Sequence, residues 1–418
     1  MKLLRLLLVP FALLVVAASR LGLPLRFGMI WSNRMGHMAG NMECYLCERE
    51  AGLSRGWDFW YHGAEPCSEQ LAKMLGRVVR IDPTPFTRIC AVVNKLFTGW
   101  ERHNIDTAQV DRDIHNLFEK QAPHLSFTPQ EKARGQEELL RMGIPRGARW
   151  VCLIVRDGAK HPHLPYHSYR NSDVAAYEQA ALALAERGYY VVRTGAKAEK
   201  KMGVIHPRII DMATNGMYSD FRHIYLLAHC AFALSNGTGP DAICVIFRRP
   251  VCYVNYVPME YLQTYHRGSL AIWKHHEKEG KRMTPAQIYA SGAGHFMRAE
   301  EFAEAGITLV DNTPQEIKDV ALEMASCLRS AEKDESFRRS GYEVINISKQ
   351  DDQHDFWHDF PRGKSAFNDK PLHGEIHMRI GAEFLKQYAE RLPELYRASP
   401  EDFSDANAEQ WARAFGGD

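Results

Sequence analysis

The sequence lacks an excess of charge of either sign. Lys and Arg number 52 and Asp and Glu number 51, which leaves a formal net charge of +1 over 418 residues. Proteins that hold nucleic acid through bulk electrostatics carry a strong basic excess, so this composition argues against a nucleic-acid partner. Internal repeats and low-complexity segments are also missing, and the length is sufficient for two domains, each with its own core.

Cysteine patterns typical of a zinc site are missing too. Cys44 and Cys47 form a C-x-x-C pair, but no second pair follows at zinc-finger spacing. The nine cysteines are an odd number, and most lie in apolar runs where a free thiol packs as a small hydrophobic side chain. This usage favours a reducing compartment.

The apolar run near the N-terminus is short for a membrane span. It extends over 13 residues, from Leu6 to Ala18, and follows Lys2 and Arg5; a span needs about 20 residues. The charged start, the apolar middle and the small residues at 17–19 resemble a secretory signal peptide. The alternative is an uncleaved anchor at the cytoplasmic face of the inner membrane, which the cysteine usage favours. The sequence does not decide whether residues 1–19 are removed.

The first half of the chain alternates between strand and helix patterns. The residues predict strands at 26–31, 58–62 and 78–81 and helices at 42–49 and 68–75, and a glycine-bearing loop at 32–41 follows the first strand. Such alternation is typical of a parallel α/β sheet. Residues 101–145 are polar and helical in character and end in Gly-Ile-Pro-Arg-Gly, which indicates a domain boundary.

The alternation restarts with the continuous apolar run 150–155, which predicts a strand buried on both faces. The later patterns predict strands at 188–193, 208–211, 231–234 and 251–255, and helices at 173–187, after Ser219, from Pro240 and at 380–392. The predicted fold is therefore α/β, with two Rossmann-like doubly wound domains facing a cleft. The predicted parts are the N-terminal hydrophobic segment 1–22, the domains 23–145 and 146–340, and a helical tail 341–418 that packs back on the domains.

A glycine-rich loop is the first candidate for a binding site. It follows the predicted strand 231–234, opens the helix at Pro240, and consists of Ser235, Asn236, Gly237, Thr238, Gly239, Pro240 and Asp241. The free backbone N–H groups and the dipole of a helix start stabilise a phosphate, and glycines let the backbone approach it closely. A strand-to-helix turn without a ligand explains the same residues, and the loop alone does not decide between the two.

Basic residues at other predicted strand ends favour the phosphate interpretation. Arg156 and Asp157 end the strand that begins the second domain, and Arg193 ends the next strand, closely followed by Lys197. In a parallel sheet these residues and the 235–241 loop meet at one edge, where ligands of such folds bind. The sequence thus predicts a cationic site for a diphosphate, made without a metal.

Further candidate residues lie in loops expected at the same cleft. In the first domain they are Arg34, Gly36, His37 and Asn41; the pKa range of His37 suits a base that accepts a proton from a hydroxyl near neutral pH. In the second domain, the segment with His161, His163 and His167 reads as a loop over the site. Its candidate ligand contacts are Tyr169, Arg170 and Asn171, and a later helix start adds Ser219 and Asp220.

Several stretches together resemble a known family. Four stretches are similar to bacterial glycosyltransferases found with surface-polysaccharide genes. They are "RMGHMAGN", "GYYVVRTGAK", the block 211–258 and "LHGEIHMRIGAEFL". The second domain more distantly resembles the C-terminal domains of fucosyltransferases and heptosyltransferases, which have the GT-B fold. In heptosyltransferases the late loop reads Asp-Thr-Gly-Pro; here Gly237 precedes Thr238, so that acidic residue is absent.

The resemblance implies transfer of a sugar from a nucleotide sugar to a hydroxyl of a surface glycan such as capsule, O-antigen or exopolysaccharide. It implies an acceptor-side first domain, a donor-binding second domain, inversion, and no cofactor or metal. His37 is the expected base, with Asp157 in reserve. No suitable Asp-x-Asp motif is present, and Asp351-Asp352 lies in a polar tail segment. The expected partners are the nucleotide sugar, a glycan or lipid-linked oligosaccharide and the inner-membrane surface.

Other functions remain open at this point. A sugar-nucleotide epimerase or a pyruvyl transferase shares paired α/β domains. A non-catalytic module that binds a nucleotide or a glycan would need the same loops. The sequence does not name the donor base, the sugar, the acceptor, the linkage or the oligomeric state, and it does not decide between inversion and retention.

Overall fold

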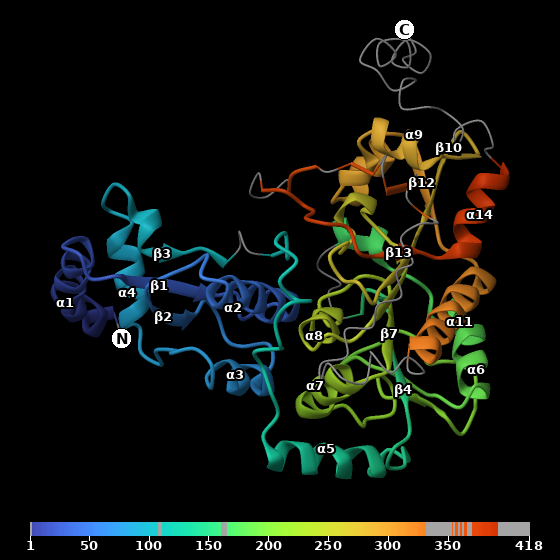
Figure 1. Cartoon of the computed structure of the whole chain (residues 1–418), viewed down its shortest axis with the longest axis horizontal. Coiled ribbons are helices and arrows are strands. Elements are labelled where there is room, and N and C mark those ends of the chain that lie inside the picture. The colour runs from blue at the N-terminus through green and yellow to red at the C-terminus, as the bar shows by residue number, and fades with distance from the viewer. Residues whose placement is uncertain are drawn as a thin grey trace, which may run out of the picture.

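The protein is mixed α/β and is built on two parallel sheets, as the sequence predicts (Figure 1). The computed structural model describes residues 2–107, 111–159, 165–331, 353, 356–357, 360–361, 363–365 and 370–391. His161, His163, Asp351 and Asp352 therefore lie outside the described residues. The parallel sheet of three strands belongs to the first part of the chain, and the parallel sheet of seven strands belongs to the second.

The first sheet has the order β2-β1-β3, with all pairs parallel. Its strands are β1 (Leu25–Ile30), β2 (Trp57–His62) and β3 (Asn104–Ile105), and the helices of this part are α1 (Lys2–Arg20), α2 (Met42–Glu50), α3 (Glu69–Leu75) and α4 (Phe86–Asn94). Gly28 pairs with Trp60, and a Cβ at Gly28 would lie 2.4 Å from the buried indole ring. A glycine at this position thus lets the largest core side chain of this half pack across the sheet.

Two predictions in this half are wrong. The predicted strand 78–81 is reduced to one bridge between Ile81 and Trp60, because Pro83 and Pro85 follow and cannot donate to a ladder. In the stretch 101–145, the described helix with α geometry is α5 (Pro129–Arg141), which begins at a capping box formed by Thr128 and Glu131. Helix α4 and strand β3 are missed by the sequence patterns.

The seven-stranded sheet is wholly parallel, with the order β13-β9-β8-β7-β4-β5-β6. Its strands are β4 (Trp150–Ile154), β5 (Tyr190–Arg193), β6 (Ile209–Asp211), β7 (Phe232–Ser235), β8 (Val251–Tyr256), β9 (Leu270–Trp273) and β13 (Arg379–Ile380). The strand order reverses between β4 and β7, and ligands of doubly wound sheets bind beyond the carboxyl ends of the strands at that point. The predicted strands of this half are confirmed, and every residue of β4, β7, β8 and β9 is buried.

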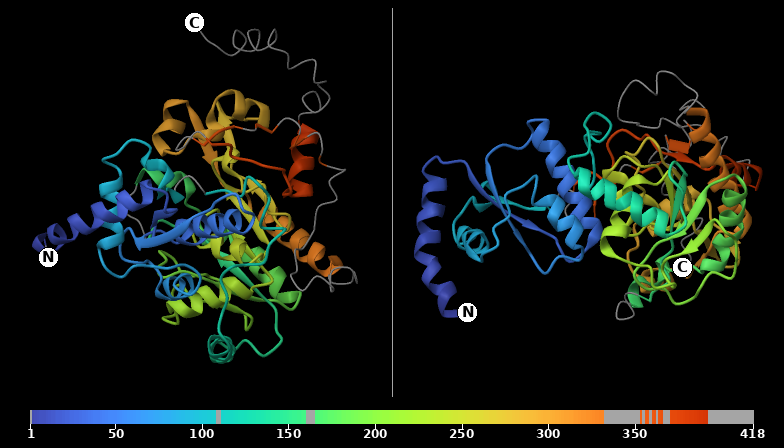
Figure 2. Two further views of the ribbon diagram at one scale, coloured as in Figure 1. Left: turned by 60° about the vertical axis from the view of Figure 1, so that its left-hand side comes forward. Right: turned by 90° about the horizontal axis from the view of Figure 1, so that it is seen from below.

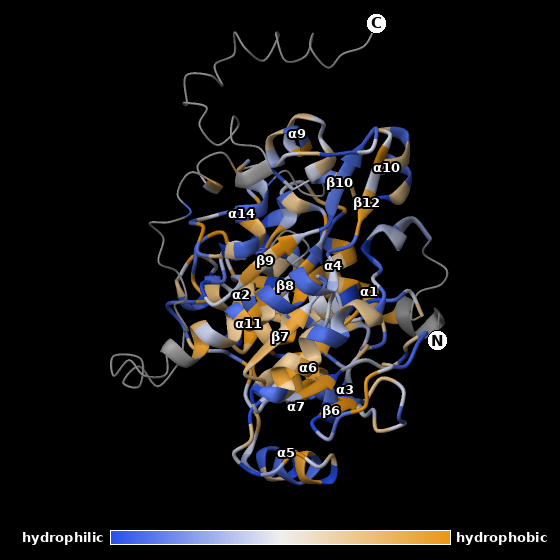
Figure 3. Cartoon of the chain, turned by 90° about the vertical axis from the view of Figure 1, so that its right-hand side faces the viewer, coloured by the Kyte–Doolittle hydropathy of each residue, from blue (hydrophilic) through white to orange (hydrophobic). Residues whose placement is uncertain are grey.

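Helices cover the large sheet, and its central strands are largely hydrophobic (Figure 3). These helices are α6 (Glu178–Glu186), α7 (Asp220–His229), α8 (Asp241–Ile246), α11 (Pro314–Ala331) and α14 (Ala382–Arg391). A small antiparallel sheet that the sequence patterns miss has the order β11-β10-β12 and consists of β10 (His275–Lys278), β11 (Lys281–Arg282) and β12 (Ile307–Val310), next to α9 (Pro285–Ala290) and α10 (Ala299–Glu304). The segment before β13 returns to the first half, where Asn116 donates to the carbonyl of Glu375 at 2.9 Å.

Helix α1 packs against α4 at the end of the molecule remote from the large sheet (Figures 1 and 2). Ala12 and Val16 are fully buried in a small core with Cys90, and Arg20 donates to the carbonyl of Thr98 at 2.9 Å. Within the described residues, no helix has the length and apolar character needed to cross a membrane. In this structure the N-terminal segment is thus a packed element of the first half.

We expect the two faces of α1 to respond differently to a charge. Val16→Asp should lower the free energy of unfolding by at least about 3 kcal/mol, because it buries a carboxylate without a partner. Leu14→Asp is the matched control on the same helix; Leu14 is 68% exposed, and the loss there should stay below about 1 kcal/mol. Urea denaturation followed by circular dichroism measures both, and equal losses would contradict the packing of α1.

Candidate functional site

A cavity of about 500 Å³ lies at the carboxyl ends of β4, β5 and β7. Its lining comes from both parts of the chain. The first part contributes Asn33, Arg34, Met35, Gly36, His37, Gly40, Asn41, Cys67, Asp111 and Phe118. The second part contributes, among others, Arg156, Asp157, Arg170, Arg193, Lys197 and the loop residues from Gly237 to Asp241. The structure thus brings together thirteen of the nineteen residues that the sequence assigns to the site.

The two glycine-bearing loops meet at the cavity. A Cβ at Gly36 would lie 3.1 Å from the Cα of Gly239, and a Cβ at Gly239 would lie 3.1 Å from the backbone nitrogen of Gly36. Four residues on, a Cβ at Gly40 would be 3.9 Å from that of Ala242 in α8. Larger residues at Gly36 or Gly239 would push the two backbones apart, so these glycines are needed for the close approach of the halves.

His37 begins a single π-helical turn, His37–Asn41, that leads into α2. Such wide turns insert one residue into a helix and often occur at functional sites. Burial lowers the pKa of His37, the positive charge of Arg34 lowers it further, and Asp111 and a hydrogen bond with Asn41 oppose the shift. The net pKa lies below 6.5, so the imidazole is neutral at pH 7 and can accept a proton.

The 235–241 loop is held together mainly by its own side chains. Asp241 is buried, and its Oδ2 accepts from the backbone N–H of Thr238 at 2.7 Å and from the Ser235 hydroxyl at 2.9 Å. Gly237 has a φ of +74° and lies against the ring of Tyr256, where a Cβ would be only 2.7 Å away. Burial raises the pKa of Asp241 to about 6, while the Thr238 and Ser235 hydrogen bonds oppose that shift.

This geometry corrects the expectation of a row of free N–H groups at the start of α8. The N–H groups of Gly237, Thr238, Asp241 and Ala242 already donate to Ser235 Oγ, Asp241 Oδ2, Thr238 O and Gly239 O, respectively. The helix itself has six residues, so its dipole is small. Pro240 also lies one position earlier than expected, as the residue that precedes the first helical one. The loop shapes the cavity. The positive charge of the cavity must come from side chains.

Asn236 connects the strand ends instead of lining the cavity. Its Oδ1 accepts from the backbone N–H of Arg156 at 3.0 Å, and its Nδ2 donates to the carbonyl of Arg170 at 3.0 Å and to Ser172 Oγ at 3.3 Å. The side chain is 1% exposed. Asn236 thereby fixes the backbones of both arginines relative to the 235–241 loop.

Arg156 and Arg170 provide the positive charge of the cavity. Arg156 Nε donates to Asn171 Oδ1 at 3.0 Å, and Arg170 donates to the carbonyl of Gly237. Among the described residues neither arginine forms an ion pair with a carboxylate, and the buried Nε of Arg170 has no hydrogen-bond partner. Burial lowers the pKa of Arg156, and so does the positive charge of Arg170. Asp157 and Asp241 lie near enough to interact with Arg156 and Arg170, respectively, but no described carboxylate lies at ion-pair distance from either guanidinium. Two like charges without a direct ion pair make a local site for an anion.

Arg193 and Asp157 line the cavity but neutralise each other. Arg193 is 1% exposed, and its guanidinium lies 3.3 Å from Asp157 Oδ2 and 3.3 Å from Asp211 Oδ2. Asp157 also accepts from the backbone N–H of Glu199 at 2.7 Å. These contacts hold the ends of β4, β5 and β6 together. Lys197 is exposed at the rim of the cavity. The roles that the sequence assigns to these residues remain predictions.

The other sequence candidates lie behind the cavity wall. Tyr169 is buried, and its ring packs 5.6 Å from that of Phe302. Asn171 supports Arg156, as described above. Ser219 caps α7 by accepting from the N–H of Arg222 at 3.2 Å. Asp220 accepts from the N–H of Gln70 in α3 at 2.7 Å and so joins the two halves.

Sequence reasoning missed several lining residues. Asp111 follows β3, and Tyr256, Gln263 and Tyr265 follow or end β8. A search of every loop that follows a parallel strand would have found them, since such loops share one edge of a sheet.

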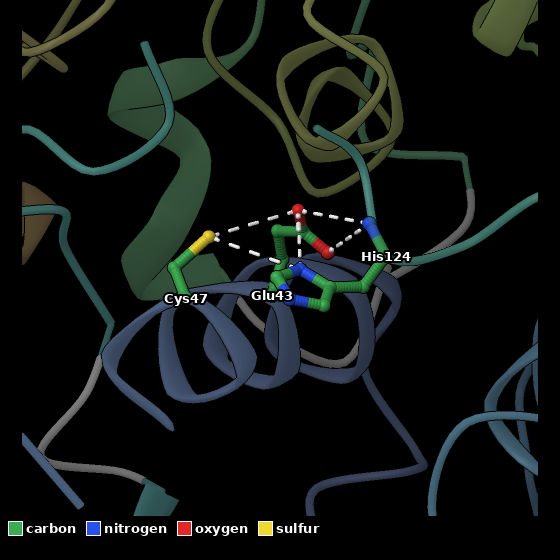
Figure 4. Close-up of side chains that lie close together, drawn as sticks. All are labelled: Glu43, Cys47 and His124. Atoms are coloured by element: carbon green, nitrogen blue, oxygen red, sulfur yellow. Dashed lines mark hydrogen bonds and ion pairs between the residues drawn. The ribbon is translucent and has the colours of Figure 1, made fainter. Parts of the chain in front are cut away.

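A second group of chemically active side chains lies where α2 meets the segment before α5 that carries His124 (Figure 4). One ligand atom each from Glu43, Cys47 and His124 lies within 4.8 Å of the others, close enough for a metal. Arg248, however, places its Nη2 2.7 Å from Glu43 Oε1 and 3.8 Å from Cys47 Sγ. Burial raises the pKa of Cys47, so its thiol is protonated at neutral pH. The guanidinium therefore supplies the cation of this cluster.

Comparisons with known proteins give structural likenesses alone. No family model matches the chain, and neither does any curated protein. The ADP-heptose LPS heptosyltransferase II of E. coli is similar over 74% of this chain and 100% of its own, with 13% identity and a TM-score of 0.42.

Two further structures are similar. A family 9 glycosyltransferase from Veillonella parvula covers 60% of this chain and 86% of its own, with 10% identity and a TM-score of 0.38. The iron-containing dodecameric glycosyltransferase TibC of enterotoxigenic E. coli covers 74% and 78%, with 13% identity and a TM-score of 0.38. The first of these structures is named as a heptosyltransferase and the other two as glycosyltransferases.

We expect Arg248 and Glu43 to be strongly coupled in stability. Arg248→Met leaves the Glu43 carboxylate buried with only His124, whose Nδ1 lies 3.3 Å from Glu43 Oε1, as a cationic partner and should cost about 3–5 kcal/mol. The double variant Glu43→Gln with Arg248→Met should lose at least about 1 kcal/mol less than the sum of the single losses. Urea denaturation of the four proteins measures this coupling.

Lys386→Met is the matched control for that cycle. Its partner Glu383 lies 2.7 Å away, but both side chains are 63% exposed. The loss should therefore stay below about 1 kcal/mol. Strictly additive losses for Glu43 and Arg248 would contradict a buried ion pair between the two halves.

Proposed function

We propose that the protein is a GT-B-like glycosyltransferase that moves a sugar from a nucleoside-diphosphate sugar to a hydroxyl group of a surface glycan, with inversion and without a metal. The observation that carries the proposal is the composition of the cavity. A neutral histidine from the first half and two arginines from the second half that form no direct ion pair with a described carboxylate line the same cavity at the switch point of the large sheet.

Arg156 and Arg170 are the residues that we assign to the diphosphate. Neither guanidinium forms a direct ion pair with a described carboxylate, and Asn236 fixes both backbones. As the bond from the sugar to the diphosphate breaks, the leaving oxygen gains negative charge, which fixed guanidinium groups stabilise. Thr238 and Gly239, which line the cavity beside them, shape the space for the phosphates.

His37 is the residue that we assign as the base. The oxygen of the acceptor hydroxyl attacks the anomeric carbon, its proton passes to His37 Nε2 or Nδ1, and the nucleoside diphosphate leaves with the electron pair of the broken bond. A single displacement of this kind inverts the anomeric carbon. The lowered pKa of His37 keeps the ring ready to accept this proton at neutral pH.

Asp157 is a poorer base in this geometry. Its Oδ2 is 3.3 Å from a guanidinium nitrogen of Arg193 and 2.7 Å from the N–H of Glu199. These two donors occupy the oxygen, so it is poorly placed to receive the proton of an acceptor hydroxyl. We therefore assign Asp157, Arg193 and Asp211 to the support of the strand ends.

The arginines can be tested by nucleotide binding. Arg156→Gln and Arg170→Gln should each weaken binding of the matching nucleoside diphosphate at least about tenfold, because a charge-assisted contact is lost. Isothermal titration calorimetry with ADP, GDP, UDP and CDP measures this and identifies the donor base. Arg55→Gln, an exposed arginine outside the cavity lining, is the control and should bind as the unchanged protein does. Unchanged affinity in both cavity variants would refute the diphosphate site.

His37 can be tested by turnover. His37→Ala should lower kcat by about 10²–10⁴ and leave nucleoside diphosphate affinity nearly unchanged, because only the proton acceptor is removed. The exposed His115→Ala is the control and should keep full turnover. A variant that still turns over normally would refute the assignment; binding without turnover in the unchanged protein would indicate a non-catalytic module, and conversion of the nucleotide sugar without an acceptor would indicate an epimerase.

The pH profile gives an independent check on His37. A base acts in its neutral form, and the pKa of His37 is lowered from 6.5. We therefore expect kcat/KM to rise with pH through a pKa below 6.5 and to be level at neutral pH. Initial rates between about pH 5 and 8 measure the profile. A rise that continues above neutral pH would point to a different base.

A further inference from the structure

The outer face of α1 is apolar although it is exposed. Positions 7, 11 and 14, which share one face of a helix, hold Leu7, Phe11 and Leu14, which are 63%, 61% and 68% exposed. The opposite face packs on α4 through the fully buried Ala12 and Val16. A soluble helix normally places polar residues on its outer face, but none lies between Arg5 and Ser19.

The apolar surface continues beyond the end of α1. Leu21 is 89% exposed, and after α4 Leu96 is 77% and Phe97 39% exposed. These two segments lie side by side, because the guanidinium of Arg20 lies 4.9 Å from the centre of the Phe97 ring and 3.0 Å from Asn94 Oδ1. We call Leu7, Phe11, Leu14, Leu21, Leu96 and Phe97 the apolar face.

The charges in the segments that carry the apolar face are mostly positive. Residues 2–20 contain Lys2, Arg5 and Arg20 and no Asp or Glu. Residues 82–102, which include α4, contain Arg88, Lys95 and Arg102 against Asp82 and Glu101. This bias is local, since the whole chain has a net charge of only +1. An exposed apolar surface with basic residues around it fits the boundary between acyl chains and anionic headgroups.

The position of α1 suits a surface contact and not a span. The helix lies at the outer end of the first half (Figures 1 and 2), so a flat surface can approach it there. One of its faces is occupied by α4, and among the described residues no helix meets the requirements for crossing a membrane. A helix packed along one side can enter the headgroup region only in the plane of the bilayer.

We propose that the apolar face docks the protein on an anionic lipid bilayer, with α1 in the plane of the membrane surface and its packing on α4 retained. Leu7, Phe11 and Leu14 enter the acyl boundary, Leu96 and Phe97 enter beside the end of α1, and the basic residues contact headgroup phosphates. This contact does not require the nucleotide site, so it goes beyond the proposed activity. Experiments on membrane binding test it independently of the proposed transferase activity.

Vesicle flotation of the full chain tests the proposal. The unchanged protein should bind vesicles of phosphatidylethanolamine with about 30% phosphatidylglycerol better than vesicles of phosphatidylcholine alone. Raising the salt from about 0.05 to about 0.5 M should weaken binding to the anionic vesicles, because the ionic part of the contact is screened. Vesicle binding that does not depend on lipid charge or on salt concentration would overturn the proposal.

Variants of the apolar face supply the residue-level test. Phe11→Asp with Leu14→Asp should lower vesicle binding at least about tenfold, while circular dichroism shows an unchanged fold because both positions are exposed. Leu96→Asp lies outside the helices and should lower binding without any effect on helix formation. Ile205→Asp, at a residue that is 97% exposed in the second half, is the matched control and should bind normally.

Two further outcomes contradict the proposal. One is vesicle binding by the double variant and by Leu96→Asp that equals that of the unchanged chain. The other is an unchanged chain that does not bind vesicles and is a dimer by light scattering, together with a Phe11→Asp, Leu14→Asp variant that is a monomer. That second result would assign the apolar face to another copy of the chain.

Discussion

The buried ion pair between Arg248 and Glu43 is the constraint on which the cavity depends. Glu43 follows the π-helical turn that carries His37, and Arg248 follows α8, which begins after the 235–241 loop. The two segments are thus joined at one end by the contact of Gly36 with Gly239 and at the other by a 2.7 Å ion pair. Since both joints are buried or tightly packed, the position of His37 relative to the second half is set by the backbone and not by loop flexibility.

The carboxylates around the cavity determine which of its arginines are neutralised. Asp157 and Asp211 neutralise Arg193, and Asp241 is occupied with its own loop. Arg156 and Arg170 are left to face the space, supported by the neutral amide of Asn236. An anion that enters is therefore attracted to the carboxyl ends of β4 and β7, which is also where His37 and Gly36 approach from the first half. The local electrostatics, and not the net charge of +1, decide what this cavity can bind.

The two proposals concern opposite ends of the first half. Its inner loop carries His37 and its outer helix α1 carries the apolar face. Under both proposals an acceptor held at a lipid surface would reach the cavity through the half that also supplies the base, while the soluble nucleotide sugar would enter from the half with the arginines. The small sheet of this half then has two tasks, to support the turn at His37 and to hold α1 through α4.

The sequence by itself determined the class of the fold and the neighbourhood of the site. Alternating apolar runs and helix patterns were sufficient for the large parallel sheet, because fully buried strands such as β4 and β7 leave an unmistakable apolar run. The rule that loops after parallel strands share one edge then placed Arg156, His37 and the 235–241 loop together. Short or partly exposed elements such as β3 and the bridge at Ile81 carry too few residues for a pattern.

Only the tertiary structure decided which of these residues remain available for a ligand. Arg156 and Arg193 look alike in the sequence, since both follow apolar strands, but Asp211 and Asp157 reach Arg193 and no described carboxylate pairs with Arg156. The sequence of the glycine loop likewise predicts free N–H donors, but the side chains of Asp241 and Ser235 accept hydrogen bonds from N–H groups of this loop. The physical reason is that hydrogen bonds and ion pairs are settled by partners far apart in the chain, and a sequence pattern records a side chain without recording what neutralises it.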